Sequence, residues 1–314
     1  MFDLSDSWVW DFWFADDGER YHMFFLYASR ALHDPDRRHY RASVGHAVSR
    51  DLVAWQRLAD ALVRSDAPAF DDLATWTGSV VRDRHGLWRM FYTGATLAPS
   101  GQNRQSVGQA TSNDLLTWTK TSTTALLSAD GDWYETLADG CWGDEAFRDP
   151  WVFADPDGVW HMLITARARS GASLGRGVVG HAVSDNLDHW ELTPPLSRPS
   201  EVGFGQLEVM QVEVVDGHPV LIFSCLGEQA SPAKRVAGGA IWAVNAESVT
   251  GPFEIDSAYP LLDDEWYVGR LLKQRGTGEW LLFAFRNRSP ESDFVGGVSN
   301  PMPVNWQKGR LTVR

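Results

Sequence analysis

Two short elements recur along the whole chain, and this repetition constrains the fold more than any other feature of the sequence. The first element fits G-x-A-x-S-x-x-L-x-x-W in three stretches, at residues 45–55, 108–118 and 180–190, and weaker copies begin at Gly239 and Gly296. The second element lies upstream of each copy and consists of a glycine turn followed by an apolar, β-branched and aromatic run, which is typical of a β-hairpin. The turn glycines are Gly18, Gly86, Gly158, Gly217 and Gly278.

Each repeat unit therefore predicts four strands: two from the hairpin, one from G-x-A-x-S and a last one near the tryptophan. Five such units predict an all-β fold, a five-bladed β-propeller with four-stranded blades. The alternative is a two-sheet sandwich with accidental similarity between segments, which the co-ordered double repeat disfavours. We expect residues 1–314 to form one propeller domain, with no β-sandwich after the fifth blade.

The chain contains 16 tryptophans, where about four would be usual for its length. A surplus of this size suits either a repeated packing motif or a site that stacks flat ligands such as sugar rings. The repeats favour packing for most of them. The tryptophans expected to pack between blades are Trp55, Trp88, Trp118, Trp160, Trp190, Trp280 and Trp306.

Charge and cysteine content exclude several classes of function. The formal net charge is −13, which repels nucleic acid and anionic membranes. The two cysteines, Cys141 and Cys225, form no metal-spaced pair and no disulfide framework. No signal-peptide pattern and no apolar run of about 18 residues occurs. We therefore expect a cytoplasmic protein without cofactor or metal site.

The inner strand of each blade lines the central channel of a propeller, so the residues that precede each glycine turn are informative. At nearly the same place on these strands lie Asp11, Asp149 and Glu208, whereas the other two blades present Thr77 and Gly269. Three carboxylates that converge on one axis repel each other and raise their pKa values. Acids with separated pKa values are what the cleavage of a glycosidic bond requires.

Four segments carry a resemblance to a known family. They are VWDFW (9–13), TWTGS (75–79), FRDP (147–150) and LEVMQVEVVDG (207–217), and they occur in this order on equivalent strands. Together they resemble the fructose-processing glycoside hydrolases of families 32 and 68, which comprise invertases, fructanases and levansucrases. The resemblance covers essentially the whole chain.

This resemblance implies a role for each acid. Asp11 would be the nucleophile, Asp149 the stabiliser of the transition state and Glu208 the general acid/base, while Arg148 would neutralise and hydrogen-bond the neighbouring site. Enzymes of this type look like retaining glycosidases, whose two catalytic carboxyl groups are about 5–5.5 Å apart. The resemblance further implies a sugar pocket lined by Trp10, Trp76 and Ser79.

Some assignments have a competing interpretation. Asp11 can be a strand-end residue beside buried tryptophans. Glu208 has a rival in Glu213 on the same strand, but an odd offset of five places Glu213 on the opposite face of a regular strand. The same alternation puts Trp13 on the side of Asp11 and makes Trp13 a candidate sugar-stacking wall, in conflict with the family resemblance, which favours Trp10.

The leading functional hypothesis is a retaining hydrolase of β-fructofuranosides such as sucrose or short fructans, with possible transfer of the fructosyl unit to another sugar. An inverting arabinan- or xylan-type glycosidase is the alternative, and its carboxyl groups would stand about 6.5–9.5 Å apart. A non-catalytic sugar-binding propeller is a third candidate. The only partner expected is a small-molecule or oligosaccharide substrate, and the oligomeric state is not encoded in any readable pattern.

Overall fold

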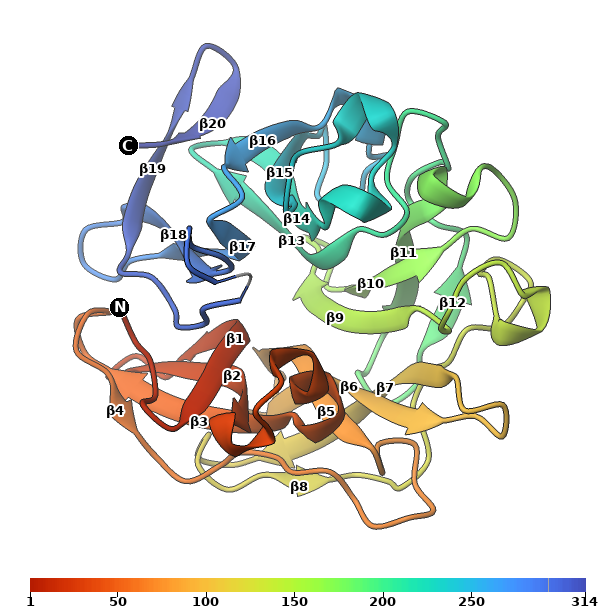
Figure 1. Cartoon of the computed structure of the whole chain (residues 1–314). Helices are drawn as coiled ribbons and strands as arrows, with labels where there is room; N and C mark the ends of the chain where they lie inside the picture. Colours follow the sequence, from red (N-terminus) through yellow and green to blue (C-terminus); the bar gives the residue numbers. More distant parts are fainter. Residues whose placement is uncertain (293) are drawn as a thin grey trace.

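The repeats fold into five four-stranded antiparallel sheets around a central axis, as a computed structural model of residues 1–292 and 294–314 shows (Figure 1). The predicted five-bladed β-propeller is thereby confirmed. In every sheet the strands are neighbours in the order of the sequence, so each blade is a meander whose first strand is innermost. No helix in the described part of the chain is long and apolar enough to cross a membrane.

The blades have the following bounds. Blade one holds β1 (Ser7–Asp16), β2 (Tyr21–Ser29), β3 (Ser43–Ser49) and β4 (Gln56–Arg57). Blade two holds β5 (Ala74–Arg82), β6 (Trp88–Leu97), β7 (Asn103–Ser112) and β8 (Thr119–Lys120). Blade three holds β9 (Phe147–Ala154), β10 (Trp160–Arg167), β11 (Gly177–Ser184) and β12 (Glu191–Thr193). Blade four holds β13 (Glu208–Val215), β14 (His218–Cys225), β15 (Ala240–Asn245) and β16 (Tyr259–Leu262). Blade five holds β17 (Trp266–Lys273), β18 (Trp280–Arg286), β19 (Met302–Gln307) and β20 (Arg310–Val313).

Among the residues that the structure describes, helical structure is confined to short 3-10 segments in the connections. They are η1 (Arg30–Leu32), η2 (Pro35–Arg41), η3 (Leu137–Asp139), η4 (Ser173–Gly175), η5 (Gly227–Gln229), η6 (Pro232–Lys234) and η7 (Ile255–Ser257).

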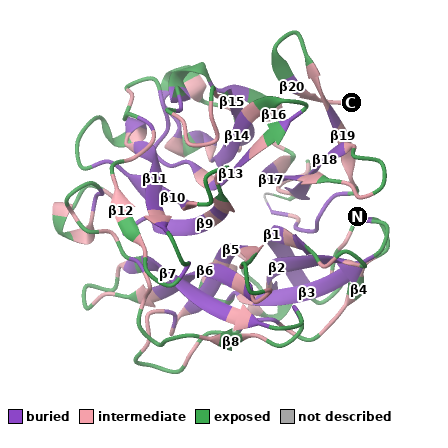
Figure 2. Ribbon diagram, turned by 180° about the vertical axis from the view of Figure 1, so that it is seen from behind, coloured by how far each residue is buried: buried purple, intermediate pink, exposed green. Residues whose placement is uncertain are grey.

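Apolar side chains from adjacent blades form the core, and buried residues fill the inner strands while exposed ones gather in the outer loops (Figure 2). The ring of Trp118 in blade two meets Phe24 of blade one, with centroids 5.6 Å apart. Trp190 of blade three meets Phe91 of blade two in the same way at 5.4 Å. All seven tryptophans predicted to pack between blades contact these apolar clusters, so most of the tryptophan surplus serves packing.

The N-terminal residues close the ring between blade five and blade one (Figure 1). Phe2 donates its backbone N–H to Val298 at 2.8 Å, and Val298 forms a bridge with Phe285 of β18. Gly297 donates to the carbonyl of Val9 on β1 at 2.7 Å. The chain therefore fastens its last blade to its first through backbone hydrogen bonds near the channel.

Every inner strand contains a β-bulge, in which one extra residue faces the second strand of the blade. A bulge bends the strand and re-aims the side chains beside it. In three blades the bulge residue has a positive φ, with values of 57° at Asp149, 53° at Val209 and 50° at Val268. Such backbone costs about 1–3 kcal/mol where a side chain is present, so the surrounding structure must hold it. The five bulge residues are Asp11, Thr77, Asp149, Val209 and Val268.

The backbone N–H of a bulge residue lacks a regular ladder partner, and in three blades a side chain of the preceding blade accepts it. Asp149 donates to Thr93 Oγ1 at 2.8 Å, and Val209 donates to Asp149 Oδ2 at 3.2 Å. Val268 donates to Ser224 Oγ at 3.0 Å. The hydrogen bonds that satisfy the bulges therefore also join blades two to five to one another.

Candidate active site

The bulges surround a cavity of about 740 Å³ at one end of the channel. The bulge residue and the residue before it line this cavity in all five blades. We call these ten residues the pocket floor. They are Trp10, Asp11, Trp76, Thr77, Arg148, Asp149, Glu208, Val209, Tyr267 and Val268.

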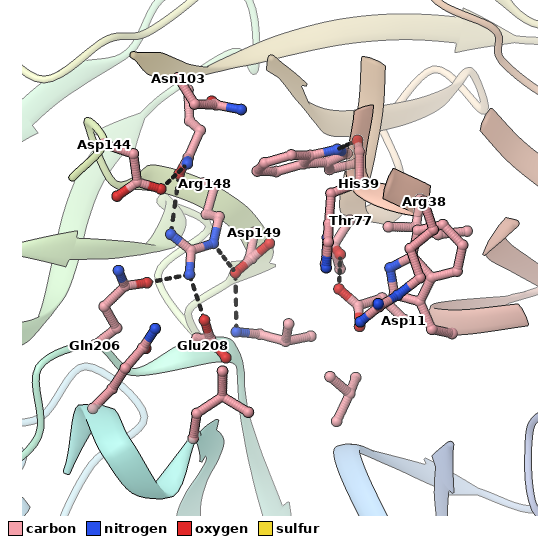
Figure 3. Close-up of a pocket in the computed structure, with 18 of the residues that line it drawn as sticks. Asp11, Arg38, His39, Thr77, Asn103, Asp144, Arg148, Asp149, Gln206 and Glu208 are labelled. Carbon is pink, nitrogen blue, oxygen red and sulfur yellow. Dashed lines mark hydrogen bonds and ion pairs between the residues drawn. The ribbon is translucent and has the colours of Figure 1, made fainter. Parts of the chain in front are cut away.

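Six of the eight predicted site residues lie in this pocket. The three acids come from three different blades: Asp11 from β1, Asp149 from β9 and Glu208 from β13 (Figure 3). The other three are Trp10, Trp76 and Arg148.

Trp13 does not line the pocket, and its prediction as a sugar-stacking wall is wrong. The alternation argument assumed a regular strand, but the bulge at Asp11 breaks the two-residue period between Trp10 and Phe12. Trp13 is fully buried and stacks against Phe24, with ring centroids 6.1 Å apart. Trp10 takes the pocket position, as the family resemblance favoured.

Ser79 also lies outside the pocket lining, which corrects its prediction as a sugar-contacting residue. Its side chain is buried, with 1% of its surface exposed, two residues beyond the bulge at Thr77. The hydroxyl accepts a hydrogen bond from the backbone N–H of Val152 at 3.1 Å. Ser79 therefore joins blade two to blade three below the pocket.

The register also changes how Glu208 relates to the other two acids. Asp11 and Asp149 are bulge residues, whereas Glu208 precedes its bulge and Val209 occupies it. In the fifth blade the bulge residue is Val268, not Gly269. Glu208 therefore occupies the same position on its strand as Arg148 does, one residue before the bulge. Asp11 and Asp149 reach the pocket from the bulge itself, and Glu208 reaches it from the position before the bulge.

Glu213, the rival of Glu208, does not line the pocket in the described structure. Its Oε1 accepts a hydrogen bond from Gln211 Nε2 at 3.0 Å, and Gln211 in turn bonds the backbone of Leu271 in blade five. Burial raises the pKa of Glu213 to about 7, although the charge of Arg270 opposes this. Glu213 therefore belongs to the seam between blades four and five.

Arg148 connects the two acids on its side of the pocket (Figure 3). Its Nε lies 3.3 Å from Asp149 Oδ2, and its Nη2 donates to Glu208 Oε1 at 2.6 Å. Two buried glutamine side chains hold the remaining edge of the guanidinium: Gln105 accepts from Nη1 at 3.0 Å, and Gln206 accepts from Nη2. The guanidinium is therefore fixed by residues of blades two, three and four.

Asp11 is held from the opposite side. Thr77 Oγ1 donates to Asp11 Oδ2 at 2.5 Å. Burial and the negative charges of Asp149 and Glu208 raise the pKa of Asp11 to about 7, while the Thr77 hydrogen bond and the charge of Arg38 lower it. A carboxylate with this pKa is ionised in about half of the molecules at neutral pH.

We expect the substitution Thr77→Val to shift the acid limb of the pH profile of kcat/KM. If Asp11 is the nucleophile that the family resemblance implies, its attack requires the ionised form, and kcat/KM of the wild type is expected to fall below about pH 7. Loss of the hydrogen bond raises the pKa further and moves the limb to higher pH by about one unit. The substitution Thr77→Ser keeps the hydroxyl and serves as the control. Superimposable profiles for the two variants contradict this role of Thr77.

Glu208 is partly buried beside the hydroxyl of Tyr267, which donates to its Oε2. Burial raises the pKa of Glu208, although the charge of Arg148 and the Tyr267 hydrogen bond oppose the rise. A raised pKa favours the protonated form, which a general acid needs. Asp11 and Glu208 therefore lie in one pocket but contact different groups: Asp11 contacts Thr77, and Glu208 contacts Arg148 and Tyr267. Two carboxyl groups with different roles need such different surroundings.

Sequence reasoning missed the contribution of η2, the segment between β2 and β3. Arg38 of this segment lies over the rings of Trp10 and Phe294, at 5.5 and 3.6 Å from their centroids. His39 lines the pocket, and its carbonyl accepts from Trp76 Nε1 at 2.7 Å. Burial and the charges of Arg38 and Arg148 lower the pKa of His39 to about 3, so this imidazole is neutral near pH 7. No repeat pattern marks the segment.

A comparison with protein families identifies the chain. The model described as the glycosyl hydrolases family 32 N-terminal domain matches residues 13–288. The chain belongs to glycosyl hydrolase family 32. The matched range includes Asp149 and Glu208 and begins two residues after Asp11, which lines the pocket beside them.

Curated relatives of this family 32 domain match in part of their length. The chain is 33% identical to beta-fructofuranosidase 1 of Zea mays over 136 residues, which is 41% of this chain and 19% of the relative. It is 25% identical to an invertase of Kluyveromyces lactis over 221 residues, or 64% of this chain and 31% of the relative. The matches therefore span about a fifth to a third of these curated relatives.

Solved structures share the fold over essentially the whole chain. A GH32 beta-fructofuranosidase of Bombyx mori superimposes with a TM-score of 0.76 and 18% identity, covering 100% of this chain and 64% of that one. An inulosucrase of Halalkalicoccus jeotgali bound to kestose gives a TM-score of 0.77 and 23% identity, covering 99% and 87%. Because the sequence identities are only 18% and 23%, these superpositions show a shared fold and do not by themselves show a shared function.

Proposed function

We propose that this protein is a retaining glycoside hydrolase that acts on β-fructofuranosides such as sucrose or short fructans, with transfer of the fructosyl unit to a sugar acceptor as a second outcome. The observation that carries the proposal is the convergence of Asp11, Asp149 and Glu208 in one pocket, with Arg148 joined to the last two. Membership of family 32 and the names of its relatives support the substrate class.

Each acid then has one role. The Asp11 carboxylate attacks the anomeric carbon of the fructosyl unit, while Glu208 gives its proton to the glycosidic oxygen and the leaving sugar departs. The covalent fructosyl ester on Asp11 is released when Glu208, now ionised, takes a proton from water or from a sugar hydroxyl. Asp149 is fixed by Thr165 Oγ1 at 3.0 Å and by Arg148, and it accepts hydrogen bonds from hydroxyls of the bound ring.

The charges that line the pocket favour a neutral substrate. Beside the three acids of the floor, Asp36 and Asp144 also line the cavity, against two arginines, Arg38 and Arg148. Arg148 is already bonded to two of the acids. A phosphorylated or otherwise anionic sugar would be repelled by this excess of carboxylates, whereas hydroxyl groups find many acceptors.

The stereochemistry of the first-formed product tests the proposal. Proton-decoupled carbon NMR of sucrose cleavage at early times is expected to show β-fructofuranose before mutarotation, and added alcohol is expected to give the β-fructoside. Retention requires two catalytic carboxyl groups about 5–5.5 Å apart, which is the separation expected for Asp11 and Glu208. An inverted anomer favours the arabinan- or xylan-type alternative, and no turnover of sucrose, inulin, levan or aryl arabinosides favours a non-catalytic propeller.

A further inference from the structure

The inner strand of blade five places an arginine against the backbone of the pocket floor. Arg270 follows the bulge residue Val268 by two positions on β17, is 1% exposed and does not line the described pocket. We infer that Arg270 is a positioning residue, which fixes the backbone beside Asp11 and the backbone beside Glu208 relative to each other. The inference rests on the proposed function, because it names what holds the two reacting carboxyl groups at their separation.

The guanidinium of Arg270 donates to backbone carbonyls of two other blades. Its Nε donates to the carbonyl of Phe12 in blade one at 3.2 Å. Its Nη1 donates to the carbonyl of Val209 in blade four, also at 3.2 Å. Phe12 follows Asp11 in the sequence, and Val209 follows Glu208. One rigid group therefore bonds the residue next to the proposed nucleophile and the residue next to the proposed acid/base.

These carbonyls lie at the bulges of β1 and β13, where regular pairing is interrupted. Val209 and Met210 have no paired residue on β14, and Phe12 is the first paired residue after the bulge of β1. The carbonyl of Met210 accepts from the same Nη1 of Arg270, at 2.8 Å. A bulge re-aims the side chains beside it, so a donor that fixes the carbonyls at both bulges also fixes the directions of the two acids.

Arg270 also brings a positive charge to this place. Burial lowers the pKa of its guanidinium to about 10, while the negative charges of Asp149, Asp11 and Glu213 oppose the fall. Arg270 is therefore protonated at neutral pH and keeps all of its donors. The attraction is mutual, so the same charge favours the ionised forms of these carboxyl groups. Geometry and charge are thus two separable contributions of this residue.

The side chain of Arg270 is itself held in place by neighbouring blades. Its guanidinium carbon lies 5.1 Å from the ring centroid of Trp151 on β9. The next residue, Leu271, is tied to blade four by Gln211, whose Oε1 accepts from the Leu271 N–H and whose Nε2 donates to the Leu271 carbonyl, both at 2.8 Å. Arg270 thus contacts blades one, three and four from a strand that is fixed on its own account, as a positioning group requires.

The test compares two substitutions that separate the donors from the charge. Arg270→Met removes both, whereas Arg270→Lys keeps a charge but lacks the planar fork that bonds two carbonyls at once. We expect Arg270→Met to lower kcat for sucrose about 10²-fold and Arg270→Lys to lower it about tenfold or more, because a misplacement of about 1 Å at reacting groups has effects of this size. The affinity for fructose, measured by titration calorimetry, is expected to stay within about threefold in both variants.

The pH profile of kcat/KM gives a readout that a loss of stability alone does not move. Removal of the charge raises the pKa of Asp11, so the acid limb of Arg270→Met is expected to lie at higher pH than that of the wild type. Arg270→Lys keeps the charge, and its limb is expected to coincide with the wild-type limb although its kcat is lower. This variant also decides the question if Arg270→Met does not fold. Full kcat in Arg270→Lys overturns the inference, since the fork of donors is then dispensable.

The matched control is Gln211→Met. Gln211 is 1% exposed and joins the same two strands, β13 and β17, but it bonds neither neighbour of Asp11 and Glu208 that Arg270 holds. We expect Gln211→Met to lower the melting temperature as Arg270→Met does and to keep kcat per folded molecule within about threefold. An equal loss of kcat in the two variants means that the seam between the blades, and not Arg270, orders the site, and it overturns the inference.

A structural measurement separates this inference from the proposed function. In crystals of Arg270→Met, the separation of the Asp11 and Glu208 α-carbons is expected to differ from that of the wild type by about 0.5 Å or more, which is the tolerance within which reacting groups must be held. If the wild type cleaves no fructoside but this shift is present, the proposed reaction is wrong and the positioning role stands. If the wild type cleaves sucrose and the variant changes neither the separation nor kcat, the positioning role is wrong and the reaction stands.

Discussion

The substitution Asp11→Asn is expected to reduce kcat on sucrose by on the order of 10⁵-fold, since it removes the nucleophile and leaves the remainder of the site in place. The amide is isosteric with the carboxyl group, and the contact with Thr77 Oγ1 can be kept with the hydroxyl as donor. Initial rates of glucose release from sucrose, measured at pH 8 where Asp11 of the wild type is largely ionised, give the size of the effect.

The fold of this variant is expected to be at least as stable as that of the wild type. The pKa of Asp11 is raised in the folded state to about 7, so the native protein binds this proton more tightly than the unfolded chain does. Above pH 7 the ionised carboxylate therefore destabilises the folded state, and a neutral amide removes that penalty. A melting temperature at pH 8 that is unchanged or higher, with Asp3→Asn at an exposed site as control, confirms this. Retained turnover of sucrose contradicts the assignment of Asp11.

The substitution Glu208→Gln is expected to lower kcat/KM for sucrose by about 10³-fold, because the departing glucose oxygen no longer receives a proton. An aryl β-fructofuranoside with a strongly acidic phenol needs little protonation, so its first step is expected to lose far less. Azide, which attacks the fructosyl ester without general-base help, is expected to restore turnover of the aryl substrate and to yield a fructosyl azide. Rates with both substrates, with and without azide, measure these effects.

The matched control for this variant is Glu213→Gln, on the same strand. Glu213 also has a raised pKa of about 7, yet it bonds Gln211 and does not line the described pocket. Glu213→Gln is expected to keep the sucrose activity within about threefold and to show no rescue by azide. If the two substitutions exchange their effects, Glu213 is the general acid and Glu208 is not.

The architecture could be predicted from the sequence because the same pattern occurs in every blade, so that a strand assigned in one blade supports the equivalent strand in the others. The glycine turns and the G-x-A-x-S element gave the strand count, and the tryptophans that follow it pack on the preceding blade, as Trp118 and Trp190 do. The direction in which side chains point on the inner strands was harder to predict from the sequence. A single inserted residue, invisible in the hydrophobic pattern, shifts the faces of β1, and for this reason alternation misplaced Trp13.

The site could be predicted only where a repeat unit or a family segment supplied a position. Asp11, Asp149 and Glu208 were predicted in this way, and the structure brings their side chains into one pocket. Arg38 and His39 come from η2, a segment that occurs only once, so no internal comparison marks them. Tyr267 is an intermediate case: it precedes a bulge as Glu208 does, and a register that included the bulges would have pointed to it.

The hydrogen bonds of the bulges have a consequence for the assembly of the molecule. Asp149, Val209 and Val268 each donate to the blade before them, and the N-terminal residues fasten blade five to blade one. No single blade thus contains a complete set of reacting groups or the contacts that aim them. We therefore expect the proposed enzymatic activity to appear during refolding only when the fifth blade meets the first. This activity would then report on closure of the ring, and we expect a chain that stops after the fourth blade to be inert even though it carries all three acids.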